Sequence, residues 1–120
     1  MAVFSGAFPV LPGKVDAMRA FANETMGTQL SGFEEAQRRV GSTRETWSLQ
    51  ELPDGHAIVL VWVETEDVTA VFADLAQDDS EWTRWFRSQV QEFTGIDLTT
   101  PPELAPEVIL DWHVEHAEPR

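Results

Sequence analysis

The chain contains no cysteine and no tyrosine, and it has few basic residues. Without cysteine it can form no disulfide, no thiolate metal site and no cysteine nucleophile. No apolar run approaches the roughly 20 residues that span a bilayer, and the start, MAVFSGAFPV, lacks the basic stretch of a signal peptide. These absences lead us to expect a soluble, cytoplasmic protein that does not associate with membranes.

The charge balance is strongly acidic, with 21 Asp and Glu residues against 8 Lys and Arg residues and a formal net charge of -13. Such a surface repels a phosphate backbone over most of its area, so we do not expect nucleic acid as a partner. The length of 120 residues predicts a single domain over residues 1–120, long enough to bury a core.

The stretch 43–64 alternates apolar and polar residues on both sides of a turn sequence, which predicts a two-stranded hairpin. Residues 53–55, Pro-Asp-Gly, suit a type I turn followed by a left-handed glycine, the usual three-residue loop. This loop pairs Leu52 with His56. The alternative is a two-residue loop, which shifts the register by one residue.

With the three-residue loop, one hairpin face is apolar and suits burial under helices, while the other is mixed and suits a ligand cavity or a subunit contact. Arg44 then lies opposite Glu64, whereas the shifted register sets Glu45 opposite Glu64, a pair of like charges. The apolar face comprises Trp47, Leu49, Ala57, Val59, Val61 and Val63, and the mixed face comprises Arg44, Thr46, Ser48, Gln50, Ile58, Leu60, Trp62 and Glu64.

Residues 2–9 predict a strand before the hairpin, followed by a helical stripe that begins at Val15. The stripe forms either one kinked helix or two helices, and in the second case a capping-box sequence at residues 31–34 starts the segment that ends at Val40. After the hairpin, Asp67 and Ser80 are typical caps of two further helices, the second over residues 81–93.

Residues 96–107 contain three prolines and predict a loop, and residues 108–116 alternate as a last strand. The order is therefore βαββαβ, a ferredoxin-like α+β fold with a four-stranded antiparallel sheet and helices on one face. The uncovered face carries Ile58, Leu60 and Trp62. Apolar groups of this size favour burial, so we expect a homodimer that pairs two such faces.

Short sequence motifs spread over nearly the whole chain resemble those of a known protein superfamily. They are Leu11-Pro12-Gly13-Lys14, Arg39-Val40-Gly41, Glu45-Thr46-Trp47-Ser48-Leu49-Gln50, Asp54-Gly55, Glu64, Trp85-Phe86, Gly95-Ile96-Asp97-Leu98 and Asp111-Trp112. Through these motifs the chain resembles the dimeric α+β-barrel superfamily and, within it, a group of small uncharacterised bacterial proteins. The resemblance to this group implies no particular activity.

The resemblance implies a dimeric α+β barrel. The wider superfamily includes cofactor-free monooxygenases of polyphenols, aromatic polyketide cyclases, lactone isomerases and haem-handling enzymes, which commonly use the pocket between sheet and helices. The fold does not choose among these activities.

His113 and Asp111 lie two residues apart on the predicted last strand, so both point to one side. A histidine beside a carboxylate is typical of general acid–base catalysis, and we treat the two as candidate catalytic residues. The alternative is a polar strand end that faces solvent or the dimer seam. His56, His113 and His116 show no ligand spacing, so we expect no metal site.

On the mixed face, Arg44 with Glu64 is a candidate for holding an anionic or enol oxygen, or else a plain cross-strand ion pair. Thr46 and Ser48 are candidate hydrogen-bonding groups of a cavity, or groups that satisfy one another across an interface. Trp62 and Trp85 are candidate aromatic walls for a planar substrate, or core residues.

The combined prediction is a homodimer that binds a small hydrophobic, cyclic or polyketide-like molecule. If it is an enzyme, it is a cofactor-free cyclase or isomerase, or a monooxygenase in which the substrate itself carries the electrons. The alternative is a non-catalytic ligand-binding or accessory dimer.

Overall fold

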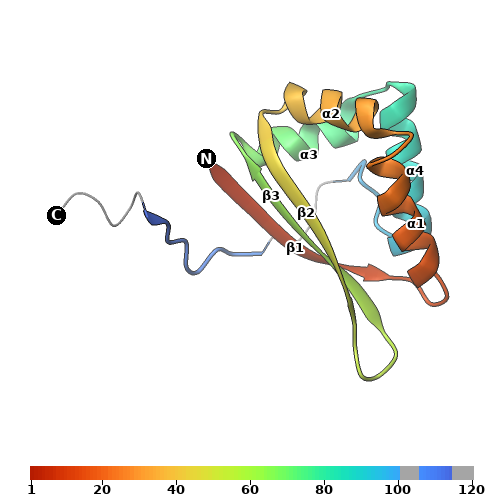
Figure 1. Cartoon of the computed structure of the whole chain (residues 1–120). Coiled ribbons are helices and arrows are strands. Elements are labelled where there is room, and N and C mark those ends of the chain that lie inside the picture. Colours follow the sequence, from red (N-terminus) through yellow and green to blue (C-terminus); the bar gives the residue numbers. More distant parts are fainter. Residues whose placement is uncertain (101–105, 115–120) are drawn as a thin grey trace.

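The protein is represented by a computed structural model that describes residues 1–100 and 106–114. Its α+β fold places helices against one side of a twisted sheet (Figure 1). The described elements are β1 (Ala2–Val10), α1 (Val15–Thr25), α2 (Leu30–Arg39), β2 (Ser42–Glu51), β3 (Ala57–Thr65), α3 (Val68–Gln77) and α4 (Glu81–Thr94). None of the helices within these residues is long and apolar enough to cross a membrane.

The sheet has the order β1-β3-β2, and both pairings are antiparallel. The register of the hairpin sets Thr46 opposite Trp62 and Arg44 opposite Glu64, as the three-residue loop predicts. The Leu52 N–H donates to the His56 carbonyl at 2.7 Å. Gly55 has a φ of 91°, the left-handed conformation that this loop requires. The predicted register is therefore confirmed.

The stripe after β1 forms two helices, α1 and α2, rather than one kinked helix. The predicted capping box at residues 31–34 is wrong, because α2 already begins at Leu30 and its cap, Gln29, makes no side-chain capping bond. The Phe33 N–H donates to the Gln29 carbonyl at 3.1 Å, so Ser31 lies inside the first turn and not before it.

The other predicted caps are confirmed. Asp67 accepts a hydrogen bond from the Thr69 N–H at the start of α3, and Ser80 accepts one from the Thr83 N–H at the start of α4. Gly95 ends α4 in the left-handed conformation, with a φ of 77°. These local signals set where α3 and α4 begin and where α4 ends.

The core lies between that face and the helices, and Phe21 of α1 is at its centre with 1% of its surface exposed. Its ring packs within 6 Å of four other aromatic rings, those of Trp47, Trp85, Phe86 and Phe93. The inner side of β3 is buried, and its Ala57 and Val59 belong to the same core cluster as Phe21, Phe86 and Phe93. The face predicted to be apolar is thus the buried one.

The predicted fourth strand is not found. In the part of the chain that the structure describes, the sheet has three strands, and residues 108–114 are exposed and outside it; residues 115 and 116 lie outside the described residues. Figure 1 shows this segment projecting from the body on the side opposite α1. A strand needs a neighbour for its backbone hydrogen bonds, and the alternating sequence of this segment does not supply one.

Candidate functional site

Five of the predicted substrate-binding residues share the outer face of the sheet, opposite the helices: Arg44, Thr46, Ser48, Trp62 and Glu64. The Arg44 guanidinium carbon lies 5.8 Å from the centre of the Trp62 ring, a cation–π contact. The Glu64 carboxylate accepts a hydrogen bond from the Thr43 hydroxyl at 2.9 Å. The register of the predicted Arg44–Glu64 pair is confirmed, but the side chains make these other contacts.

The sixth, Trp85, is on the opposite side of the sheet. It lies on α4, where its ring centre is 5.5 Å from that of Phe21 and 6.0 Å from that of Trp82. The structure therefore places Trp85 in the aromatic layer under the helices and does not bring it together with Trp62.

The two candidate catalytic residues, Asp111 and His113, lie on the projecting segment, where both are exposed. Because this segment is not a strand, strand alternation does not orient their side chains. Their catalytic pairing stays a prediction. Among the described residues, no group of three or more His, Asp or Glu side chains is arranged to hold a metal ion.

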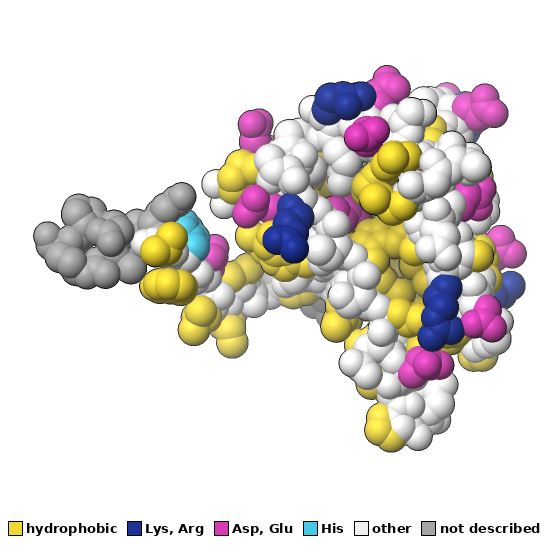
Figure 2. Space-filling model, viewed as in Figure 1, with side chains coloured by type: hydrophobic (Ala, Val, Ile, Leu, Met, Phe, Trp, Pro, Cys, Tyr) yellow, Lys and Arg dark blue, Asp and Glu magenta, His cyan; other side chains and the backbone are white. Residues whose placement is uncertain are grey.

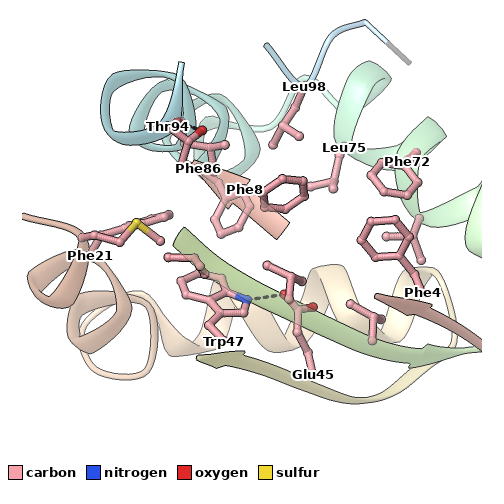
Figure 3. A pocket seen from close by; sticks show the side chains of 16 residues that line it. Phe4, Phe8, Phe21, Glu45, Trp47, Phe72, Leu75, Phe86, Thr94 and Leu98 are labelled. Carbon is pink, nitrogen blue, oxygen red and sulfur yellow. Dashed lines mark hydrogen bonds between the residues drawn. The ribbon is translucent and has the colours of Figure 1, made fainter. Parts of the chain in front are cut away.

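A cavity of about 80 Å³ lies between the inner face of the sheet and helices α1, α3 and α4 (Figure 3). Its wall is almost wholly apolar, and Glu45 is the only ionisable residue among those that line it. The aromatic part of the wall comprises Phe4, Phe8, Phe21, Trp47, Phe72 and Phe86. A single carboxyl group in such surroundings is the most unusual chemical feature of the fold.

Two donors hold the Glu45 carboxylate. The Trp47 indole N–H donates to Oε2 at 2.6 Å, and the Gln37 side-chain amide donates to Oε1 at 2.9 Å. Trp47 follows two residues later on β2, whereas Gln37 comes from α2. The residue as a whole is partly exposed, but its carboxyl group is withdrawn from solvent, and this burial raises the pKa of Glu45 even though the two hydrogen bonds lower it.

Glu45 also lines two further cavities, so several internal spaces of the protein meet at this residue. One, of about 90 Å³, is bounded by residues of α1 and α2 that include Thr25 and Phe33. The other, of about 40 Å³, lies between α2 and α3 and includes Gln37 and Asp74 in its wall. Glu45 is thus part of the wall of three cavities.

A wider groove of about 290 Å³ lies between α1 and β2 and shares Met18, Trp47 and Val59 with the central cavity. Figure 2, seen from the same side as Figure 1, shows apolar surface in this region. Its lining also includes Arg19, which contacts Asp16 at 2.9 Å and Glu51 at 3.5 Å. The groove therefore leads from a charged rim to Trp47, the residue that donates to Glu45.

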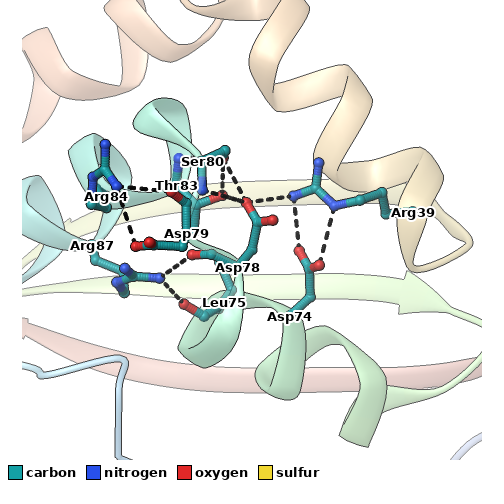
Figure 4. A network of polar contacts seen from close by, with 9 residues as sticks. All are labelled: Arg39, Asp74, Leu75, Asp78, Asp79, Ser80, Thr83, Arg84 and Arg87. Carbon is teal, nitrogen blue, oxygen red and sulfur yellow. Dashed lines mark hydrogen bonds and ion pairs between the residues drawn. The ribbon is translucent and has the colours of Figure 1, made fainter.

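A polar network ties together the helices around this site (Figure 4). Arg39 of α2 donates two hydrogen bonds of 3.1 Å to Asp74 of α3 and contacts Asp78 at 3.3 Å. Hydrogen bonds from Ser80 and Thr83, both 2.6 Å, lower the pKa of Asp78 to about 2. The network is suited to holding α2, and with it Gln37, in place.

Sequence reasoning did not select Glu45, although a signal was available. Glu45 has the same parity along β2 as Trp47 and Leu49, which were placed on the buried face. Strand alternation therefore puts a carboxyl group on an apolar face, where an ionisable residue is rare unless it has partners.

The chain matches no protein-family model, no curated protein sequence and no solved structure.

Proposed function

We propose that the protein is a small-molecule-binding homodimer that takes a hydrophobic, cyclic or polyketide-like molecule between sheet and helices, where Glu45 transfers a proton. The observation that carries this proposal is a buried carboxyl group with a raised pKa in an apolar cavity. Titratable groups with shifted pKa values concentrate at functional sites, because catalysis needs a proton donor or acceptor suited to the working pH.

The chemistry is cofactor-free isomerisation or cyclisation. Glu45 takes a proton from a carbon next to a substrate carbonyl, and the electron pair moves onto the carbonyl oxygen to form an enolate. The enolate carbon then attacks a second carbonyl, whose oxygen takes the proton from Glu45. In a conjugated substrate, Glu45 instead returns the proton to another carbon of the dienolate. Neither route consumes an oxidant or a reductant. The apolar wall strengthens these electrostatic interactions by excluding water. Gln37 and Trp47 orient the carboxylate by donating to one oxygen each.

The substrate enters through the groove between α1 and β2. The central cavity, about 80 Å³, is smaller than the roughly 300 Å³ at which ligand pockets begin. The adjoining groove adds about 290 Å³ and shares three lining residues with it. A cyclic molecule that occupies both would place its buried end near Glu45 and its polar end near Arg19.

The proposed homodimer uses the outer face of the sheet, as in the dimeric α+β barrels that the sequence resembles. Leu60 on this face is 43% exposed. The order β1-β3-β2 supports a ferredoxin-like arrangement, since among the described residues no strand pairs with β1 on the side where a fourth strand would lie. In this dimer Arg44, Thr46, Ser48 and Glu64 line the seam.

The small volume of the central cavity favours a second candidate, the non-catalytic ligand-binding or accessory dimer. In such a protein the Gln37–Glu45 hydrogen bond joins α2 to β2, the Trp47–Glu45 hydrogen bond lies within β2, and neither has a catalytic role. The two candidates differ in what the carboxyl group does to a bound molecule.

Proton exchange measures this difference. The protein is incubated in D₂O with bicyclic aromatic ketones, and NMR follows deuterium incorporation next to the carbonyl. We expect Glu45→Gln to keep the binding affinity but to lower the exchange rate by at least about 100-fold, the usual contribution of a general base. The matched control is Glu34→Gln, an exposed residue of α2. Binding with equal exchange rates in the wild type and Glu45→Gln would overturn the catalytic proposal.

A further inference from the structure

The C-terminal segment exposes an unusual amount of apolar surface. Five apolar residues within it are between 51% and 91% exposed: Val108, Ile109, Leu110, Trp112 and Val114. Soluble monomers seldom display contiguous apolar surface of this kind, and where they do, it marks an interaction site. The segment is therefore suited to burial against a surface that is absent from the single chain.

The sequence of this segment indicates that it would be buried as a β-strand. Residues 108–114, Val-Ile-Leu-Asp-Trp-His-Val, are rich in β-formers and alternate in polarity after Ile109. In an extended chain, Val108, Leu110, Trp112 and Val114 point to one side, and Ile109, Asp111 and His113 point to the other. This is the pattern of a strand with one buried face, in a segment that has no neighbouring strand in the described structure.

The matching acceptor is the free edge of β1. Among the described residues β1 pairs with β3 alone, so its second row of backbone N–H and C=O groups faces no strand. Sheet edges are normally protected from association by charged residues or prolines. β1 contains no charged residue, and its single proline, Pro9, is next to its end. Most of the edge is thus open to a further strand.

The side chains of β1 fit the two sides of such a strand. Phe4 and Phe8 point into the helix-covered side and line the central cavity, and Phe4 packs on Phe72 of α3 at 4.9 Å. Leu110 and Trp112 of an added strand would extend this apolar wall. On the outer side β1 presents Ser5 and Ala7, which are both exposed. Asp111 and His113 of an added strand would lie beside them and stay in contact with solvent.

We infer that residues 108–114 of one copy add to the free edge of β1 of a second copy, and reciprocally. The segment projects away from the body of its own chain (Figure 1), so a second copy is the occupant that the geometry favours. Reciprocal addition closes a twofold-symmetric dimer and buries both segments. The inference rests on the homodimer proposed above and assigns the segment that joins it.

Cross-linking tests the inference directly, because the chain has no cysteine of its own. Full-length Ser5→Cys and Asp111→Cys chains are refolded together and treated with a short bismaleimide. We expect a covalent dimer in the mixture and little in either variant alone. The double variant Ser5→Cys/Asp111→Cys, treated at high dilution, controls for docking onto the same chain. A link within one chain, or no link in the mixture, overturns strand exchange.

Sedimentation equilibrium separates this inference from the homodimer itself. Leu110→Asp/Trp112→Asp is expected to raise the dimer dissociation constant by about 100-fold or more, because two large apolar side chains lose their burial. Asp111→Asn, on the other side of the strand, should leave it within about twofold. A dimer unchanged by the double variant overturns strand exchange and leaves the face-to-face homodimer standing, whereas a monomeric wild type overturns both.

Discussion

The two faces of the sheet differ in chemistry although the same strands build them. On β2, Glu45 and Trp47 turn inward to a cavity with an almost wholly apolar wall, while Arg44 and Thr46 turn outward. Glu45 has a raised pKa because it is buried. Asp78, at the end of α3, instead has a lowered pKa because hydrogen bonds from Ser80 and Thr83 hold its ionised form. The period of two along a strand thus separates neighbouring residues into opposite electrostatic environments.

The largest expected contrast is in packing. Phe21→Ala on the inner side should lower the free energy of unfolding by about 3–5 kcal/mol, because it leaves a cavity among four aromatic rings. Leu60→Ala on the outer side should lower it by less than about 1 kcal/mol in the monomer, because Leu60 is 43% exposed. Urea unfolding at low protein concentration measures both. Equal losses would show that the outer face is also buried.

The second contrast concerns the buried carboxyl group. A folded-state pKa raised above the unfolded value gives stability that is present below the unfolded pKa and is lost as the pH rises through the folded pKa. We therefore expect the stability of the wild type, relative to Glu45→Gln, to fall as the pH rises above the ordinary value of 4.5. Urea unfolding between pH 4 and pH 8 measures this difference, with Glu34→Gln as the control. A difference that does not change with pH would contradict the raised pKa.

Asp78 should show the opposite sign. Its pKa is lowered from 3.8 to about 2, so its contribution is present above 3.8 and is lost as the pH falls through about 2. Asp78→Asn should reduce stability at neutral pH by about 1 kcal/mol, a modest value because the group is near solvent. The difference from the wild type should shrink between pH 4 and pH 2. The matched control is Asp79→Asn, whose carboxylate contacts Arg84 at 3.3 Å.

The smallest effect is expected on the outer face. Arg44→Ala removes the cation–π contact with Trp62 and should lower the free energy of unfolding by about 0.5 kcal/mol. Arg44→Lys, which keeps a positive charge, should recover part of that loss. Tryptophan fluorescence during urea unfolding follows both variants. A loss above about 2 kcal/mol in the monomer would mean that Arg44 has a role beyond this exposed contact.

How much of the fold could be predicted depended on how local each signal was. The hairpin register followed from residues 52–56, because the turn alone determines which side chains face each other. The caps at Asp67 and Ser80 could be predicted because each side chain accepts a hydrogen bond from a backbone N–H group only two or three residues later. The start of α2 could not be predicted in this way, since Gln29 makes no side-chain capping bond.

The candidate site was less predictable. The outer-face residues Arg44, Thr46, Ser48, Trp62 and Glu64 were correctly grouped by strand parity, but Trp85 comes from a helix on the far side of the sheet. The significance of Glu45 depends on Gln37, which is eight residues earlier and on α2. Only the packing of α2 against β2 brings these two side chains together.

The sequence by itself therefore determined the hairpin register, the caps of α3 and α4 and the side of the sheet to which each hairpin residue points, because these depend on neighbours along the chain. The tertiary structure alone decided that Glu45 is withdrawn from water and that residues 108–114 stand apart from the sheet. Burial depends on which distant segments cover a side chain, and a strand exists only where another strand offers its backbone. Neither condition can be read from the residues concerned.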